Sequence, residues 1–124
     1  MKTLKTDHAQ LNLCDNLYWE VFFDDDVTLD IESITEILDL IADDSVSHPV
    51  LIHSENVFGV DFQSLEFISQ GHHPALDRLH VLIVDTNNMS QRYMKALMSL
   101  KSEDKNIVPF DNTEDAKAYI LAHL

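Results

Sequence analysis

With 124 residues, of which 45% are hydrophobic and 24% charged, the chain is long enough for one hydrophobic core and too short for two. Its 22 acidic residues against eight basic ones give a formal net charge of −14, which disfavours binding to nucleic acid or to anionic membrane surfaces. We therefore expect a single domain over residues 1–124 that binds neither.

The hydrophobic pattern of the first third predicts a β-hairpin followed by a helix. Residues 10–14 alternate polar and apolar, Asp15 and Asn16 are turn formers, and residues 17–23 are rich in aromatic and β-branched side chains. Apolar residues then recur at helical spacing, so we expect a helix that begins at Thr28 and ends near Ala42.

Strands and helices are expected to alternate over the rest of the chain. Short apolar runs predict strands at residues 49–53, 80–84 and 106–110. Helical spacing predicts helices that begin at Asp61, at Asn88 and at Asn112 or Thr113. The predicted fold is a single-domain α/β protein in the order ββαβαβαβα, with a mixed, mostly parallel sheet of about five strands.

A binding surface is expected where the parallel strands end, because ligands of open α/β sheets bind beyond the carboxyl ends of the strands. The loops at this edge are residues 54–61, 85–88 and 111–112, and the helix beginning at Asp61 would point its N–H groups toward it. We expect His53 itself to be buried and hydrogen-bonded. The predicted binding residues are His53, Ser54, Asn56, Asp61, Gln63, Ser64, Asp85 and Asn87.

No catalytic residue is predicted. The chain has only two glycines, which are too few for a phosphate-binding loop, and it has no Gly-x-Ser-x-Gly motif. Cys14, the single cysteine, lies in a hairpin beside acidic residues that would disfavour its thiolate. The sequence therefore favours a protein without enzymatic activity.

Neither a metal nor a cofactor is predicted. The seven histidines lack the spacing of metal ligands, and we expect His72 and His73 to be solvated residues of a loop. The acidic run at residues 24–26 and the segment VLIVDT at residues 81–86 are similar to two segments of receiver domains. A degenerate receiver domain is the weaker alternative, because the separation of the two segments does not fit and no lysine follows a final strand.

The location that we expect is the cytoplasm. One cysteine permits no intramolecular disulfide, and the N-terminal residues have no apolar stretch of the kind found in a signal peptide.

Charge is unevenly placed, with a net −12 over residues 1–62 and −2 over residues 63–124. Two interpretations of the acidic half stay open: a solvated surface, or a face for a basic partner.

Residues 50–65, VLIHSENVFGVDFQSL, resemble the central strand, loop and helix of the STAS and anti-sigma-factor-antagonist-like superfamily. There an apolar strand ends in Asp, and Asp-Ser-Ser-Gly-Leu opens the next helix. His53 stands at the strand-end position here, and Asp61 and Leu65 match the Asp and Leu of the helix. Residues 106–120, NIVPFDNTEDAKAYI, are similar to the tail of the STAS/SEC14-like branch. The resemblance implies a STAS-like fold over nearly the whole chain.

The chain departs from this family at the position that is phosphorylated in its switching members. Phe62 stands in place of that serine, and Ser64 replaces the glycine. The resemblance implies a regulatory or protein-interaction module that is not switched by phosphorylation at the usual position. It implies a protein partner and is compatible with a homodimer.

The SEC14-like branch suggests an alternative, a carrier domain for a small molecule or a lipid. It would need an open groove, although a methionine stripe usually belongs to a core. The residues that would line the groove are Phe58, Phe62, Tyr93, Met94 and Met98.

Overall fold

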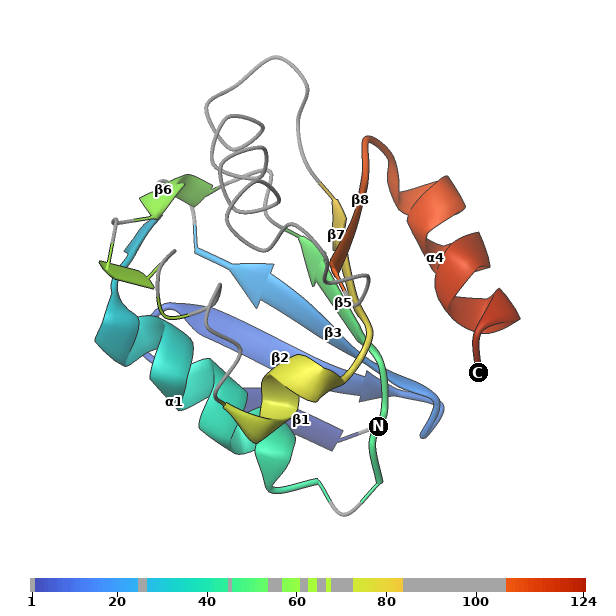
Figure 1. The fold of residues 1–124 in the computed structure, drawn as a ribbon, viewed down its shortest axis with the longest axis horizontal. Helices are drawn as coiled ribbons and strands as arrows, with labels where there is room; N and C mark the ends of the chain where they lie inside the picture. Colours follow the sequence, from blue (N-terminus) through green and yellow to red (C-terminus); the bar gives the residue numbers. More distant parts are fainter. Residues whose placement is uncertain are drawn as a thin grey trace.

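The computed structural model describes residues 2–24, 27–44, 46–53, 57–60, 63, 64, 67, 73–83 and 107–124. Its elements in chain order are β1 (Lys2–Lys5), β2 (Ala9–Cys14), β3 (Tyr18–Phe23), β4 (Val27–Leu29), α1 (Ile31–Ala42), β5 (Val50–His53), β6 (Val57–Val60), the 3₁₀ helix η1 (Pro74–Asp77), β7 (His80–Ile83), β8 (Ile107–Phe110) and α4 (Thr113–Ala122) (Figure 1). Residues 63, 64 and 67 are helical. The starts of the two helices predicted at Asp61 and Asn88 lie outside the described residues.

The described strands form an α/β domain around a six-stranded mixed sheet in the order β1-β2-β3-β5-β7-β8. The pairs β1–β2 and β2–β3 are antiparallel, whereas β3–β5, β5–β7 and β7–β8 are parallel. A second sheet consists of β4 and β6, which are also parallel. The mixed α/β architecture with an antiparallel N-terminal hairpin is thus confirmed, and β1 adds a strand that the pattern did not predict.

The predicted hairpin is present, and its turn uses the conformation that its sequence favours. Asp15 and Asn16 have φ values of 52° and 56°, a left-handed region that Asn and Asp tolerate better than most residues. Leu17 N donates to Cys14 O at 2.8 Å and closes the turn. Cys14 pairs with Tyr18, so the connection holds three residues.

Two boundaries between Val27 and Val60 differ from the prediction for one shared reason. Val27–Leu29 and Val57–Val60 pair as β4 and β6, so helix α1 begins only at Ile31 and the loop predicted at residues 54–61 contains a strand. Asp30, rather than Thr28, caps α1, because its side chain accepts a hydrogen bond of 2.8 Å from Ser33 N.

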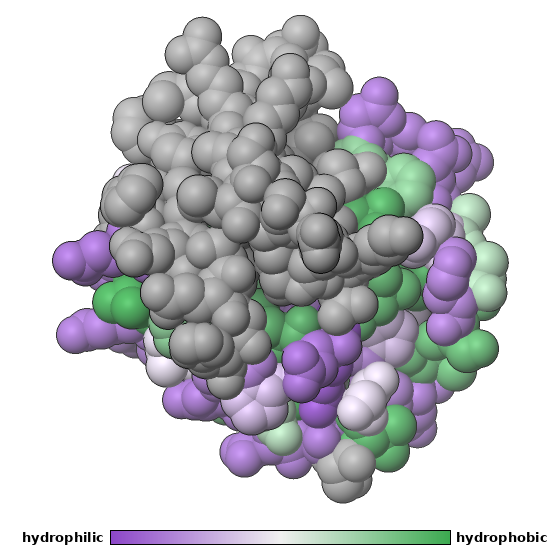
Figure 2. All heavy atoms as spheres, in the orientation of Figure 1, coloured by the Kyte–Doolittle hydropathy of each residue, from purple (hydrophilic) through white to green (hydrophobic). Residues whose placement is uncertain are grey.

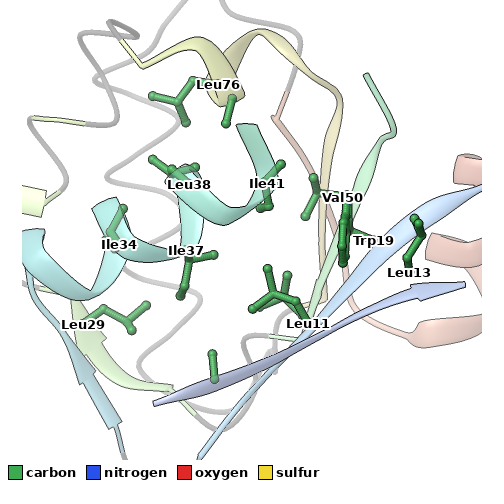
Figure 3. Close-up of a cluster of buried hydrophobic side chains, with 13 residues drawn as sticks. Leu11, Leu13, Trp19, Leu29, Ile34, Ile37, Leu38, Ile41, Val50 and Leu76 are labelled. Carbon is green, nitrogen blue, oxygen red and sulfur yellow. The ribbon is translucent and has the colours of Figure 1, made fainter. Parts of the chain in front are cut away.

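The two faces of the sheet are covered by different helices (Figure 1). The larger core lies between the sheet and the helices α1 and η1. Figure 3 shows side chains of α1 between the strands and Leu76 of η1. Alternation along β5 sends Val50 into this core and Leu51 into a smaller one beneath α4. The smaller core consists of Leu51, Val81, Ile83, Ala116 and Ile120.

Helix α4 begins where the sequence predicts. Asn112 is its N-cap, because the Asn112 side chain accepts a hydrogen bond of 2.8 Å from Asp115 N. It ends at Ala122, with His123 as its C-cap. Among the described helices, none has both the length and the apolar character that a membrane span requires.

Candidate functional site

The predicted binding surface is described only in part. His53 ends β5, Gln63 is exposed and Ser64 is fully buried. The other predicted binding residues, Ser54, Asn56, Asp61, Asp85 and Asn87, lie outside the described residues. Of the residues proposed to line a carrier groove, Phe58 lies in β6, whereas Phe62, Tyr93, Met94 and Met98 lie outside the described residues.

His53 is held in place from two directions. Its Nε2 donates a hydrogen bond of 2.9 Å to Glu20 Oε2, and its ring stacks on Phe22 with the centroids 4.3 Å apart and the planes at 9°. Phe22 is the neighbour of His53 in the parallel pair β3–β5. Only 14% of the His53 side chain is exposed, so the expectation of a hydrogen-bonded, largely buried histidine is confirmed.

Glu20 is the centre of this cluster. It is 8% exposed although its strand neighbours Trp19 and Val21 point into the opposite core. Lys117 Nζ of α4 lies 3.6 Å from Oε2, and Cys14 Sγ of β2 lies 3.8 Å from Oε1. A buried carboxylate requires such partners, since its charge is otherwise expensive to remove from water. Glu20 thereby joins β2, β3, β5 and α4 at one point.

The sequence pattern did not predict Glu20 and Lys117 as site residues, because the residues of this cluster are distant from one another in sequence. The available signal was the single acidic residue within the apolar run YWEVFF, since glutamate is rarely buried without a partner. Nothing in the sequence identified Lys117 as that partner.

The cluster disfavours the thiolate form of Cys14. Burial raises the pKa of the thiol, and the charge of Glu20 raises it further. The pKa of the neighbouring Tyr18 is raised by burial first, then by Cys14 and Glu20. The prediction of a disfavoured thiolate is therefore confirmed, but the acid responsible lies across the hairpin and not beside Cys14 in sequence.

Replacing Glu20 with glutamine should make Cys14 react faster with a disulfide reagent at neutral pH. The reaction proceeds through the thiolate, whose fraction grows when a nearby negative charge is removed. Stopped-flow absorbance with an aromatic disulfide between pH 7 and pH 10 measures both the rate and the midpoint of the titration.

The variant Asp15→Asn is the matched control, because Asp15 adjoins Cys14 in sequence but is exposed. It should leave the midpoint nearly unchanged, and circular dichroism should show both variants folded. An equal effect of the two variants would contradict the role assigned to Glu20.

A second polar cluster surrounds Asp44, which follows α1. Trp19 Nε1 donates a hydrogen bond of 2.9 Å to Asp44 Oδ2, and the same oxygen accepts a hydrogen bond from His48 Nδ1. Arg78 Nη2 donates a hydrogen bond of 3.1 Å to the backbone carbonyl oxygen of Asp44, and Arg78 Nη1 lies 3.8 Å from Asp44 Oδ2. His48 Nε2 lies 2.9 Å from Asn16 O of the hairpin turn. This cluster ties the hairpin, α1 and the segment before β7 together.

The pKa of Asp44 is lowered by the balance of opposing effects. Burial alone would raise it, but hydrogen bonds from His48, Trp19 and the N–H of Val46 stabilise the carboxylate more. Because Asp44 lies at the amino ends of β5 and β7, away from His53, we assign it a structural role.

His73 corrects the expectation of a solvated loop histidine. Its Nδ1 accepts a hydrogen bond of 3.1 Å from Ala75 N, and its Nε2 donates one of 2.7 Å to Asp39 Oδ1. Only 11% of its side chain is exposed. The reason is that Pro74 begins η1 and His73 caps it. His72 lies outside the described residues. Within the part of the chain that the structure describes, no group of three or more His, Cys, Asp or Glu side chains could hold a metal ion.

Comparisons of the chain with protein-family models, with curated proteins and with solved structures found no match.

Proposed function

We propose that this chain is a non-enzymatic regulatory or protein-interaction module of STAS-like type, which binds a protein partner at the carboxyl edge of its parallel strands. The observation that carries the proposal is the Phe22–His53 stack. Phe22 is 38% exposed, yet its ring is fixed against a histidine that is itself bonded to buried Glu20. An aromatic ring that is already ordered loses little conformational freedom on binding, which favours its use as an interface anchor.

The position of the Phe22–His53 stack supports binding at the edge of the sheet that the sequence pattern indicates. Phe22 and His53 lie at the carboxyl ends of β3 and β5, and His53 leads directly into residues 54–56. Asp24, which follows β3, is exposed. Its carboxylate would attract a basic partner surface to this edge, and added salt would weaken that attraction.

Phosphorylation at the family position is not part of the proposal. Phe62 cannot accept phosphate, and Ser64, two residues further on, is fully buried. A kinase could reach Ser64 only if this part of the chain opened. The proposed module therefore binds without that switch.

The variant Phe22→Ala should reduce capture of the partner at least tenfold. The immobilised chain is incubated with a cell lysate, and the captured proteins are quantified by mass spectrometry. Leu17→Ala is the matched control, because Leu17 is 40% exposed but precedes the opposite end of the same strand. It should capture the partner as the wild type does.

Two outcomes would contradict this proposal. Equal capture by the wild type and by Phe22→Ala would remove the aromatic anchor from the interface. A small molecule or lipid that remains bound in native mass spectrometry of the purified chain, without any captured protein, would favour the carrier alternative.

A further inference from the structure

Four side chains form a row across the strands β1, β2, β3 and β5. Lys5 pairs with Gln10, and Gln10 pairs with Phe22. Phe22 in turn pairs with His53. Paired residues of neighbouring strands direct their side chains to the same face of a sheet. Because Val21, the strand neighbour of Phe22, is buried in the larger core on the α1 side, the row lies on the opposite face.

Phe22 is the residue of this row whose ring offers a face to a partner. His53 stacks on one side of the ring, with the centroids 4.3 Å apart, and Phe22 is still 38% exposed. Since Gln10 and His53 flank Phe22 in the row, the other ring face is turned toward Gln10. The face of an aromatic ring carries partial negative charge and attracts cations. A cationic group of the partner is therefore suited to this ring face.

Two hydrogen-bond acceptors belong to the residues next to Phe22. Gln10 Nε2 donates a hydrogen bond of 3.1 Å to Asn12 Oδ1, which orients the amide and leaves Gln10 Oε1 as an acceptor. Asp24 is exposed and follows Phe22 by two residues, so it lies on the same face of the strand. The N–H of Asp24 donates a hydrogen bond of 3.0 Å to the carbonyl oxygen of His8, which extends the pairing of β2 and β3 to this residue.

We infer that this arrangement binds an arginine side chain of the protein partner, which rests on the proposed function. A guanidinium group is planar, so it stacks on the ring of Phe22 while its N–H groups donate to Gln10 Oε1 and to the carboxylate of Asp24. A lysine ammonium is compact and strongly hydrated, and it offers no plane to the ring. The net charge of −14 favours the approach of either cation, and the ring selects between them.

Charge alone would not place an arginine at this row. Acidic side chains are also exposed on the α1 side of the molecule, at Glu32, Glu36 and Asp39. Figure 2 shows mainly hydrophilic residues along the lower left of the surface, where Figure 1 places α1. Lys5 stands at the far end of the row, roughly 10 Å from Phe22 at two strand spacings. It is exposed, so water and salt screen its repulsion of the arginine.

Titration of the isotope-labelled chain, followed by nuclear magnetic resonance, tests this inference. The probes are three Gly/Ser peptides with blocked ends that differ only at a central arginine, lysine or citrulline. The arginine peptide should shift the ring signals of Phe22 and the amide signal of Asp24. The lysine peptide should bind at least about threefold more weakly, because it has the charge without the plane. The citrulline peptide, which has the plane without the charge, should not bind measurably.

Variants of the chain separate the two parts of the contact. Asp24→Asn should weaken binding of the arginine peptide about fivefold, because a charge-assisted hydrogen bond becomes a neutral one. Asp15→Asn is the matched control, since it removes the same charge from an exposed residue before the opposite end of β3, and it should bind as the wild type does. Phe22→Leu keeps an apolar side chain without the ring and should weaken binding at least about threefold. Circular dichroism should show all three variants folded.

Equal binding of the arginine and lysine peptides would overturn the inference, because it would show attraction to charge without selection by the ring. No binding of the arginine peptide would overturn it as well, as would equal losses with Asp24→Asn and Asp15→Asn. Each of these results leaves the proposed function standing, since that function is contradicted by normal capture of the partner from the lysate with Phe22→Ala.

Discussion

Replacing Trp19 with alanine is expected to lower the free energy of unfolding by about 4 kcal/mol, the largest effect of any single substitution proposed here. Trp19 is 1% exposed, and Figure 3 shows its ring between Leu13 and Val50 in the larger core. The substitution removes most of the apolar contacts of that ring and leaves a cavity in the sheet–helix interface. It also removes the N–H donor to Asp44.

Urea unfolding followed by far-ultraviolet circular dichroism measures this loss, since Trp19 is the only tryptophan and its fluorescence disappears with it. Trp19→Phe keeps much of the apolar volume but not the donor, so it should cost less, about 2 kcal/mol. Phe22→Ala is the control on the same strand. Because Phe22 is partly exposed, its loss should stay below about 1 kcal/mol. Equal losses in the free energy of unfolding for Trp19→Ala and Phe22→Ala would contradict the burial of Trp19 and the partial exposure of Phe22.

Elements with a strong local pattern could be predicted from the sequence. The hairpin has its turn residues, the strands at residues 50–53, 80–83 and 107–110 are short apolar runs between polar segments, and α4 has a capping Asn112. In each case the information lies within a few consecutive residues. Local pattern is sufficient there because the tertiary contacts agree with it.

The strands β1, β4 and β6 could not be predicted in the same way. Each has three or four residues, and β4 becomes a strand only by pairing with β6, which lies beyond α1 in the chain. That pairing also decides between two possible helix caps, Thr28 and Asp30. Strand propensity depends strongly on such distant partners, so a window of neighbouring residues does not contain the answer.

The polar clusters show the same limit. The position of His53 at the end of a parallel strand follows from the pattern, because strand ends are where binding residues gather. Its partner Glu20, and Lys117 as a further partner of Glu20, do not follow, since sequence spacing gives no contact between β3, β5 and α4. A buried charge in an apolar run indicates that a partner exists, and only the fold identifies it.

Asp44→Ala is expected to destabilise the protein by about 3 kcal/mol near neutral pH, because it leaves Trp19 Nε1 without its acceptor and removes the carboxylate 3.8 Å from Arg78 Nη1 in a poorly solvated site. Asp43, the exposed neighbour that caps the end of α1, provides the control. Asp43→Asn should change stability by no more than about 0.5 kcal/mol.

The effect of Asp44 should also depend on pH, in a direction fixed by its pKa. That pKa is lower in the folded chain than its ordinary value of 3.8, so the unfolded chain binds a proton at a higher pH than the folded chain does. The stability that Asp44 contributes is therefore fully present above 3.8 and is lost as the pH falls through the folded pKa. The difference between the wild type and Asp44→Ala should consequently shrink on acidification.

Urea unfolding at about pH 7, 5, 3 and 2.5 follows this difference for the wild type, Asp44→Ala and Asp43→Asn. The gap to Asp44→Ala should stay constant between pH 7 and pH 5 and then narrow, whereas Asp43→Asn should track the wild type. A gap that is unchanged at the lowest pH would mean that the carboxylate charge contributes nothing to this cluster. In that case Arg78 and Trp19 would be held by packing and by the backbone carbonyl of Asp44 alone.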